Sequence, residues 1–355
     1  MERAYRIALY PGDGIGPEVV HEAVRALDAS SERARSFRFE WTTFPWGAKH
    51  WEQTGRVVPE GFLEQLRPFD AILLGAVGWP ARLPDHATLE PLKRIRQTFD
   101  QYACVRPARL PRGVRCPIAG KGPADVDMVV VRENSEGEYV DSGGRFRVGE
   151  REEFALQTAI HTRRGIDRVL RFGFDLARKR RRRLVMATKS NAQKYGYVLW
   201  DEILDELRPE NPDVTAERQH ADALLMNLVR RPEAFDVIVA SNLFGDLITD
   251  LSSCLSGGLG LAPSANLNPE RAHPSLFEPV HGSAPDIAGK GLANPIAAIL
   301  AGAMMLDWLG ETGAARSIEA AADKTLADGC ATADLGGQLG TSEMASEVIA
   351  RLGKV

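Results

Sequence analysis

The sequence predicts an α/β fold with a central, mostly parallel sheet that is flanked by helices on both faces. The first observation is that short apolar strands alternate with amphipathic helices along most of the chain. Because a helix between two strands allows a crossover connection, such strands are expected to pair in parallel. The second observation is the length of 355 residues, which suffices for two domains of ordinary size. The third is the composition, 44% hydrophobic and 26% charged, which is typical of soluble globular proteins.

The first hundred residues carry the alternation most clearly. An apolar strand is expected at residues 5–11, followed by a glycine-rich turn and a helix whose apolar face begins at Val19. The same pattern predicts strands at 37–44 and 70–74 and helices at 60–66 and 89–99.

From residue 103 the pattern changes. Strands at 127–132 and 138–140, followed by a glycine-rich polar stretch at 142–149, predict hairpins instead of crossovers. The alternation then returns, and the last part of the chain is expected to form alanine-rich helices. The elements expected between these parts are helices at 164–180, 193–207 and 244–255 and strands at 184–188 and 235–240.

Composition excludes several classes of function. The net charge of -4 provides no global basic field for nucleic acid, and no apolar run approaches the ~20 residues of a membrane span. The four cysteines form no CxxC pair, and the N-terminus lacks the apolar stretch of a signal peptide, so we expect reduced thiols in a cytoplasmic protein. The basic run at 178–183 is expected to be a solvated helix end, with nucleic-acid or anion binding as the alternative.

Glycines between the first strand and helix do not form the usual dinucleotide fingerprint. Gly12, Gly14 and Gly16 depart from GxGxxG because Pro17 stands where the third glycine belongs, so a standard Rossmann fold is not expected. The loop could present N–H groups to an anion or simply make a tight turn, and both interpretations stay open.

Three aspartates are candidate metal ligands. Asp246 and Asp250 are four residues apart on an expected helix, so their carboxylates share one face, and Asp222 stands at the start of another helix. Oxygen donors without cysteine or histidine suit Mg²⁺ or Mn²⁺ better than zinc. The alternative is that acidic residues in a first turn only complement the helix dipole.

Other polar residues stand near the ends of expected elements. Arg96, Arg106 and Arg132 could each bind a carboxylate through a forked guanidinium. Lys189 follows a buried strand, where partial desolvation would lower its pKa enough for base chemistry, and Tyr139 could donate a proton. Each of these residues taken alone could equally be a surface or packing residue.

The joint order of these motifs resembles the metal-dependent β-decarboxylating dehydrogenases, the family of isocitrate and isopropylmalate dehydrogenases. The similarity covers nearly the whole chain, and within the family it is greatest to the tartrate and D-malate dehydrogenase branch. The family motifs lie at 12–18, 131–139, 188–191, 241–246 and 278–291, and the branch motifs at 99–102, 263–266 and 268–271.

The resemblance implies an isopropylmalate dehydrogenase-like fold of two domains. Residues 1–102 and 257–355 would form a discontinuous cofactor-binding domain, and 103–256 an inserted domain for substrate, metal and dimerisation, with an intersubunit arm near 139–162. It also implies a homodimer with shared active sites, in which Lys189 and Asp222 come from the neighbouring subunit.

The implied reaction is the oxidation of a small 2-hydroxy dicarboxylic acid such as D-malate or tartrate by NAD, usually with β-decarboxylation. Arg96, Arg106 and Arg132 would hold the substrate carboxylates, Lys189 would take the hydroxyl proton, and Tyr139 would protonate C3. The implied ligands of Mg²⁺ or Mn²⁺ are Asp222, Asp246 and Asp250, and K⁺ is a further candidate cofactor.

The resemblance places the cofactor against the loop that follows Glu278. Asp286 would accept hydrogen bonds from the adenosine ribose and repel a 2′-phosphate, which favours NAD over NADP. The implied cofactor-binding residues are His281, Gly282, Ser283, Ala284, Asp286, Ile287, Asn294 and Asn191.

Substrate choice depends on residues 86–95, where Lys93 and Arg94 favour a small or polar group at C3. The alternative substrate is 3-isopropylmalate or another 3-substituted malate of the isocitrate or homoisocitrate type. A catalytically silent regulatory subunit is the alternative outside this class.

Overall fold

The structure is a computed structural model that describes residues 3–354. Its strands are β1 (Arg3–Gly12), β2 (Phe37–Thr43), β3 (Ala71–Ala76), β4 (Ala103–Arg109), β5 (Asp127–Glu133), β6 (Gly143–Phe146), β7 (Phe154–Gln157), β8 (Arg183–Thr188), β9 (Thr215–His220), β10 (Val237–Ala240), β11 (Pro263–Leu267) and β12 (Ser275–Pro279). Its α-helices are α1 (Gly16–Ala34), α2 (Ala48–Thr54), α3 (Phe62–Leu66), α4 (Asp85–Thr88), α5 (Glu90–Thr98), α6 (Arg163–Arg178), α7 (Gly196–Leu207), α8 (Ala221–Arg230), α9 (Asn242–Leu255), α10 (Ile296–Leu309), α11 (Thr312–Ala327) and α12 (Thr341–Arg351).

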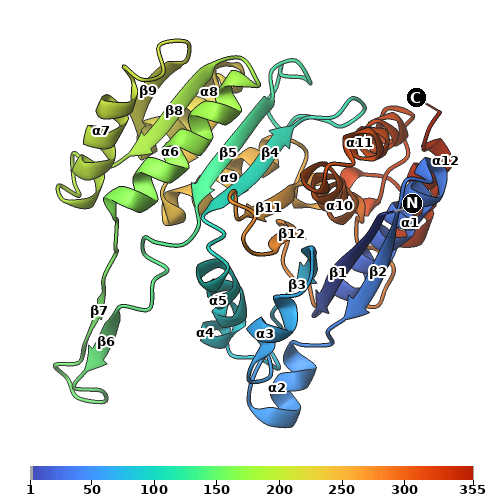
Figure 1. The fold of residues 1–355 in the computed structure, drawn as a ribbon, viewed down its shortest axis with the longest axis horizontal. Helices are drawn as coiled ribbons and strands as arrows, with labels where there is room; N and C mark the ends of the chain where they lie inside the picture. The colour runs from blue at the N-terminus through green and yellow to red at the C-terminus, as the bar shows by residue number, and fades with distance from the viewer. Residues whose placement is uncertain (1–2, 355) are drawn as a thin grey trace.

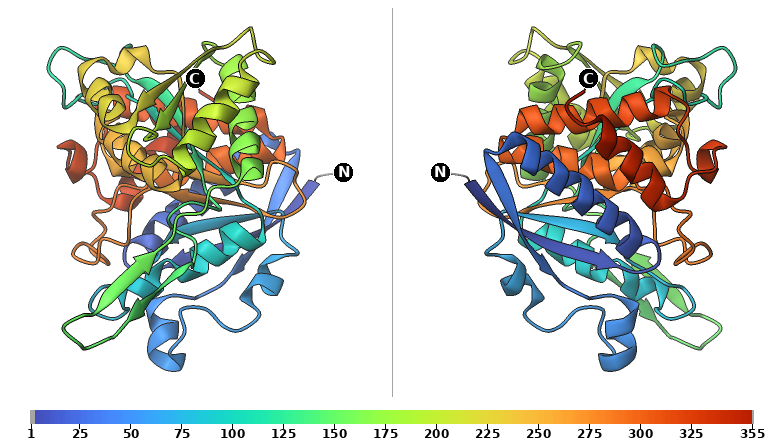
Figure 2. Two further views of the ribbon diagram at one scale, coloured as in Figure 1. Left: turned by 90° about the vertical axis from the view of Figure 1, so that its left-hand side faces the viewer. Right: turned by 90° about the vertical axis from the view of Figure 1, so that its right-hand side faces the viewer.

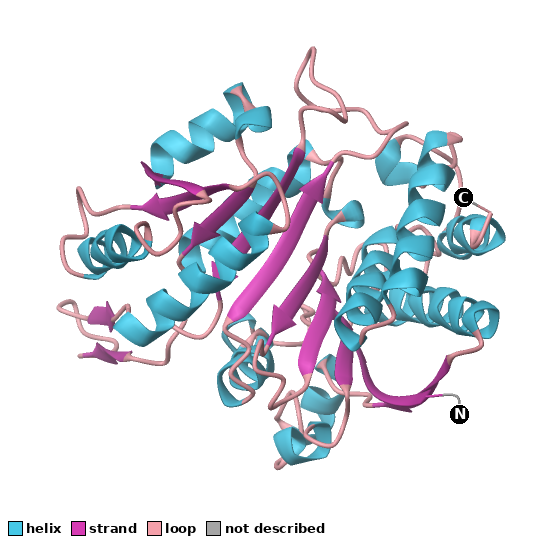
Figure 3. Ribbon diagram, turned by 45° about the horizontal axis from the view of Figure 1, so that its top comes forward, coloured by secondary structure: helices cyan, strands magenta, loops and turns pink. Residues whose placement is uncertain are grey.

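One mixed sheet of ten strands crosses the part of the molecule that the structure describes (Figure 1). The strand order is β2-β1-β3-β12-β11-β4-β5-β10-β8-β9. Pairing is parallel towards both edges and antiparallel only at the three central pairs, β12 with β11, β11 with β4, and β4 with β5. The expected mostly parallel sheet is confirmed, and helices lie on both of its faces (Figure 3).

Four of the ten strands were not predicted. The missed strands are β4, β9, β11 and β12. They contain proline, asparagine or charged residues instead of the apolar run by which a strand is recognised in a sequence. β4 and β11 are also the strands at which residues 103–256 join the rest of the sheet. We propose that the boundary between the two expected domains lies at this pair.

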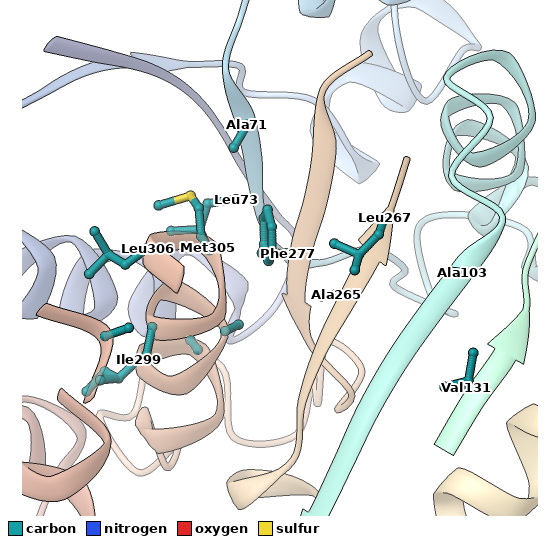
Figure 4. Close-up of a cluster of buried hydrophobic side chains, with 14 of the residues drawn as sticks. Ala71, Leu73, Ala103, Val131, Ala265, Leu267, Phe277, Ile299, Met305 and Leu306 are labelled. Atoms are coloured by element: carbon teal, nitrogen blue, oxygen red, sulfur yellow. The ribbon is translucent and has the colours of Figure 1, made fainter. Parts of the chain in front are cut away.

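The core fills both sides of the sheet. Phe277 of β12 and Leu73 of β3 pack against Ile299 and Met305 of α10, and the same cluster extends across the sheet to Val131 of β5 (Figure 4). A second cluster lies under α8 and α9 and includes Ile238. Both halves of the chain therefore share a continuous apolar interior that holds the strand ends in place.

The β6–β7 hairpin extends away from the body of the molecule (Figures 1 and 2). The prediction of a strand at 138–140 is wrong, because around it only Gly137 and Ile160 form an isolated bridge. The hairpin strands lie further along, inside and beyond the polar stretch at 142–149, and Phe146 and Phe154 stack across them with ring centroids 4.9 Å apart. Glycine-rich strands with a few scattered aromatic residues lack the alternation that identifies a half-buried strand.

The basic run at 178–183 is an exposed helix end, as expected, since residues 179 and 181–183 are exposed. Arg178 pairs with Asp213, while Arg180 and Arg181 both pair with Asp127 and Asp236. These ion pairs join the end of α6 to Asp127 of β5 and to Asp236, which directly precedes β10. The four cysteines are free thiols. Among residues 3–354 no helix has the length and apolar character needed to cross a bilayer.

Candidate active site

A pocket of about 240 Å³ lies where α5, β4, β5 and α9 meet the end of β12. Six residues proposed from sequence line it together: Arg96, Arg106, Arg132, Tyr139, Asp246 and Asp250. Each reaches the pocket from a different element except Asp246 and Asp250, which both come from α9. The fold thus brings together the anion-binding, proton-donating and two of the three metal-binding candidates.

Three other pocket residues converge on Asp246. Its carboxylate accepts hydrogen bonds from Arg132 Nη1 at 2.5 Å, Arg106 Nη1 at 3.2 Å and Tyr139 Oη at 3.0 Å. Burial raises the pKa of Asp246, but Arg132 and Arg106 outweigh it, so that the pKa lies below its usual value. Gly245 makes the contact possible, since a Cβ there would lie 2.5 Å from Cγ of Arg132.

Asp250 lies one helical turn beyond Asp246 on the same side of α9. Burial and the charge of Asp246 raise the pKa of the Asp250 carboxyl. Two carboxylates that repel each other across a pocket form a site that a cation would stabilise. Within residues 3–354 no group of three or more histidine, cysteine or acidic residues is placed to hold a metal ion, so Asp222 does not join this pair within one chain.

Lys189 and Asp222 lie together, but outside this pocket. Lys189 Nζ is 3.0 Å from Asp222 Oδ1, and the lysine lowers the pKa of that carboxyl. Asn191 follows in the exposed turn after β8. The chain therefore presents these three candidates on a surface of their own, next to the starts of α7 and α8.

Buried polar contacts hold each of the three arginines. Arg96 Nη2 donates to Glu278 Oε1 at 2.9 Å, and Asn266 Nδ2 donates to the same oxygen at 2.8 Å. Arg132 Nη2 donates to Asn242 Oδ1 at 2.7 Å. Sequence reasoning missed Glu278 as part of this pocket; its one signal was its place at the head of the 278–291 motif, which was assigned to the cofactor.

The three guanidinium groups face three carboxylates around the pocket, those of Asp246, Asp250 and Glu278. The pKa of Arg132 falls to about 10, because burial penalises its charge and Arg106 and Arg96 repel it, against which Asp246 compensates only in part. Burial opposes the charge of Arg106 as well, but the negative groups around it, which include Asp246, outweigh burial and raise its pKa.

Tyr139 reaches the pocket from the segment after β5. Its ring lies 5.2 Å from the guanidinium carbon of Arg132, and burial together with Asp246 raises the pKa of its hydroxyl. The phenol is therefore protonated at neutral pH and its proton points at a carboxylate. This arrangement suits a proton donor that regains its proton through the polar groups around it.

The expected cofactor loop begins at the wall of the same pocket, to which His281 and Gly282 contribute. His281 Nε2 is buried without a hydrogen-bond partner, and burial lowers the pKa of the imidazole. Farther along the loop, Ala284 has a φ of 39°, Ile287 packs against the core, and Asp286 is exposed. An extended nucleotide fits along this loop, with the neutral imidazole of His281 in the pocket and the exposed carboxylate of Asp286 beyond it.

Other residues of this loop already have structural partners. Asn294 Nδ2 donates to Asp334 Oδ2 at 3.1 Å, while its Oδ1 accepts from Ile296 N at 3.0 Å at the start of α10. Ser283 is buried, and its carbonyl accepts from Ile15 N at 2.8 Å. Both residues shape the loop as well as lining it.

The Gly12–Gly16 turn is a structural joint. The N–H of Asp13 donates to Ala76 O and that of Ile15 to Ser283 O, so neither is available to an anion. Gly14 has a φ of +60°, and a Cβ there would lie 1.8 Å from Ser283 O. Of the two interpretations left open, the tight turn is the one that the structure favours.

The segment before Arg96 presents an apolar wall to the pocket. Leu89 and Leu92 line it, whereas Lys93 is half-buried away from it and Arg94 pairs with Glu90 at 3.6 Å. Neither Lys93 nor Arg94 is among the residues that line the pocket. The argument for a polar wall from Lys93 and Arg94 is therefore wrong.

Comparison with known proteins agrees with this geometry. The family model described as isocitrate/isopropylmalate dehydrogenase matches residues 6–348. The chain belongs to the isocitrate/isopropylmalate dehydrogenase family. It is therefore an oxidoreductase of the dehydrogenase type, as its motifs predict.

Individual relatives cover nearly the whole chain. D-malate dehydrogenase (decarboxylating) of Escherichia coli K12 is 49% identical over 359 residues, covering 98% of each protein. Tartrate dehydrogenase/decarboxylase of Pseudomonas putida is 47% identical, covering 98% of this chain and 99% of the relative. The crystal structure of isocitrate dehydrogenase from Methylococcus capsulatus superposes with a TM-score of 0.89 at 37% identity, over 98% of this chain and 99% of that one. The predicted family and fold are confirmed.

Proposed function

We propose that the chain oxidises a small 2-hydroxy dicarboxylic acid with NAD and a divalent metal ion, and decarboxylates the product, with D-malate or tartrate as substrate. The observation that carries the proposal is the convergence of Arg96, Arg106 and Arg132 on one pocket of about 240 Å³ beside two carboxylates. The names of the relatives from Escherichia coli and Pseudomonas putida support the choice of substrates.

The pocket limits the substrate in size and charge. Its volume is below that of ordinary drug-sized sites, which favours a compact acid. Guanidinium groups can each bind a carboxylate in a forked geometry, so the three arginines suit an acid with two carboxylates. The apolar wall of Leu89 and Leu92 favours a second candidate, 3-isopropylmalate or another malate with an apolar group at C3.

The donor set fits Mg²⁺ or Mn²⁺. Asp246 and Asp250 supply oxygen donors that repel each other without a cation, and Asp222 of a second copy would complete the ligands. When bound, the ion would lower the cost of ionising the substrate hydroxyl and stabilise negative charge that develops on oxygen. K⁺ remains a further candidate cofactor without assigned residues.

The chain's own groups would move the protons. Tyr139 Oη faces the pocket as a protonated phenol and would deliver a proton to C3 of the decarboxylated product. Lys189 would take the proton of the C2 hydroxyl, and because it lies outside its own chain's pocket it would reach the substrate from a neighbouring subunit. In this proposal the catalytic centre is complete only when two chains assemble.

The loop after Glu278 would hold NAD. His281 and Gly282 lie at the pocket, where a nicotinamide would meet the substrate, and Ser283, Ala284, Ile287 and Asn294 follow along the loop. The exposed Asp286 carboxylate would accept from the ribose and repel a 2′-phosphate. Asn191 of the second subunit would approach the nicotinamide.

Exposed apolar residues support a homodimer. Phe146, Phe154 and Leu156 are 44–55% exposed on the β6–β7 hairpin, and Met226 and Leu247 are exposed on α8 and α9. Single apolar residues are common on surfaces, but a protruding hairpin of this kind needs a partner. A hairpin that crosses to a second copy would cover them. We place the enzyme in the cytoplasm, where its free thiols would stay reduced.

The test is NADH formation by the purified protein with Mn²⁺, K⁺ and NAD, with CO₂ trapped in parallel. We expect turnover on D-malate or a tartrate isomer, weaker turnover on 3-isopropylmalate and isocitrate, and loss of all turnover on chelation. Preferential turnover of 3-isopropylmalate would establish the second candidate. Binding of NAD and metal without turnover on any of these acids would contradict the proposal and favour the silent regulatory subunit.

A further inference from the structure

A second cavity, of about 370 Å³, lies between the helices α10 and α11 and the strands β4 and β11. None of its lining residues belongs to the pocket described above. Its volume is at the lower end of the range of small-molecule sites, so it suits a ligand of metabolite size.

The floor of this cavity is apolar. Leu261, Leu300 and Met304 line it, together with prolines from both strands. Such a floor favours an aliphatic or thioether side chain, since it offers no hydrogen bonds to replace those of a sugar or a base.

The rim of the cavity carries both signs of charge. Arg109 and Asp323 pair with each other at 2.6 Å, whereas Arg316 and Glu319 form no ion pair within residues 3–354. Because Arg316 and Glu319 are three residues apart on α11, they are neighbours on one helix face. The guanidinium of Arg316 and the carboxylate of Glu319, unpaired within the described residues, together match a ligand that carries one negative and one positive charge. The carboxylates of Glu319 and Asp323 would repel a phosphate ester.

We propose that this cavity binds a free aliphatic α-amino acid. The ligand's carboxylate would bind Arg316, its ammonium group would bind Glu319, and its side chain would occupy the apolar floor beside Leu300. The site requires neither substrate nor cofactor, so binding can be measured whether or not the proposed function holds.

The cavity lies directly behind the substrate pocket. Pro107 and Pro263 line the cavity, and their chain neighbours Arg106 and Ser264 are joined on the other face by a hydrogen bond of 3.3 Å from Arg106 Nε. Successive residues of a strand point to opposite faces, so β4 contributes to both sites, with Pro107 in the cavity and Arg106 in the pocket. A ligand in the cavity would therefore change the position of Arg106 and alter the binding of the acid substrate; this second part rests on the proposed function.

The first experiment is calorimetric titration of the intact protein with L-leucine. We expect binding that weakens about tenfold or more in Arg316→Gln and in Glu319→Gln. Isoamylamine and 4-methylpentanoate, which each lack one charge, should bind about tenfold more weakly than leucine. Arg38→Gln, which removes an exposed arginine of the edge strand β2, is the matched control and should bind normally.

A second variant, Leu300→Trp, should abolish binding by filling the cavity, with its fold checked by circular dichroism. The site proposal is overturned if leucine does not bind at millimolar concentration, if the singly charged analogues bind equally well, or if the two α11 variants bind like the wild type. The coupling is supported if leucine changes the KM of the acid substrate in the wild type but not in Arg316→Gln, and it is overturned if saturating leucine leaves KM unchanged.

Discussion

Tyr139 donates its hydroxyl hydrogen to Asp246 at 3.0 Å, although 107 residues of chain separate them. The contact joins the proposed proton donor to the carboxylate that also receives Arg106 and Arg132. Burial and the negative charge of Asp246 keep the phenol protonated. The orientation of the proton donor is therefore set by the same residue that is proposed to bind the metal ion.

Replacing Tyr139 by phenylalanine removes the proton and the contact with Asp246 while leaving the ring in place. We expect kcat for the decarboxylating reaction to fall by about 10²- to 10⁴-fold, with a smaller change in KM, because proton transfer is lost and the arginines remain. Steady-state kinetics with CO₂ trapping measures both. Tyr195→Phe, at an 81% exposed tyrosine outside the pocket, is the control. An unchanged kcat in Tyr139→Phe would contradict the proton-donor role.

The raised pKa of Asp250 should make the stability of the metal-free protein depend on pH. Its pKa is raised in the folded state by burial and by Asp246, so the folded protein binds this proton more tightly than the unfolded chain does. Ionised Asp250 therefore destabilises the fold at neutral pH, and the penalty disappears as the pH falls through the raised pKa.

Asp250→Asn should accordingly raise the Tm of the metal-free protein at pH 7, and the gain should shrink progressively as the pH is lowered towards 4. Thermal melts at several pH values with a chelator present provide the measurement. With saturating Mn²⁺ the order should reverse, because the wild type gains binding energy that the variant lacks. A variant that is less stable than the wild type at pH 7 without metal would refute the argument.

Arg168 of α6 joins the segment that leads to Tyr139 to the end of α5. Its Nη1 lies 2.8 Å from both carboxylate oxygens of Asp100, its Nη2 donates to Ser135 Oγ at 3.0 Å, and its guanidinium carbon lies 4.0 Å from the ring centroid of Tyr102. Arg168→Met should lower the free energy of unfolding by about 2 kcal/mol, discounted from the value for a fully buried pair because Asp100 is partly exposed.

Urea denaturation measures this loss. Arg208→Met removes an exposed pair with Asp205 on the surface of α7 and should cost less than about 1 kcal/mol. Equal losses in the two variants would mean that the contacts of Arg168 contribute no more than an ordinary surface ion pair.

At Gly245 the helical preference for alanine conflicts with the close contact that α9 makes with Arg132. Alanine is favoured over glycine inside a helix by up to about 1 kcal/mol. At Gly245, however, the new Cβ would lie 2.5 Å from Cγ of Arg132, so that the arginine must move. We expect Gly245→Ala to raise the KM of the acid substrate about tenfold or more, because a displaced guanidinium no longer fits the carboxylate.

Gly313 of α11 is the matched control, since a Cβ there meets no atom within 4 Å. Gly313→Ala should leave KM unchanged and raise the free energy of unfolding by up to about 1 kcal/mol. Wild-type KM in Gly245→Ala would show that Arg132 tolerates the displacement.

Much of the fold and the site was predictable because it depends on local sequence. The apolar runs of β1, β3, β5, β8 and β10 identify strands by themselves, and the residue types at Arg96, Arg106, Arg132, Tyr139, Asp246 and Asp250 are chemically distinctive. Ordered family motifs then predicted the family that the comparisons confirm.

Other features depend on partners that are remote in sequence. β4 and β11 become strands because each pairs with a neighbouring strand that completes its backbone hydrogen bonds. Their prolines and polar residues do not predict this pairing. Glu278 enters the site only because β12 ends beside Arg96, 182 residues away in the chain. The side of α5 that faces the pocket, with Leu89 and Leu92 instead of Lys93, is decided by how that helix packs.

The sequence by itself therefore determined the class of fold, the family and the identity of the reactive groups, since these follow from residue types and their local spacing. Only the tertiary structure decided which of those groups meet in one chain. It joined Asp246 to Arg132 and Tyr139 and left Lys189 with Asp222 outside the pocket, because hydrogen bonding and ion pairing depend on distances that chain folding creates.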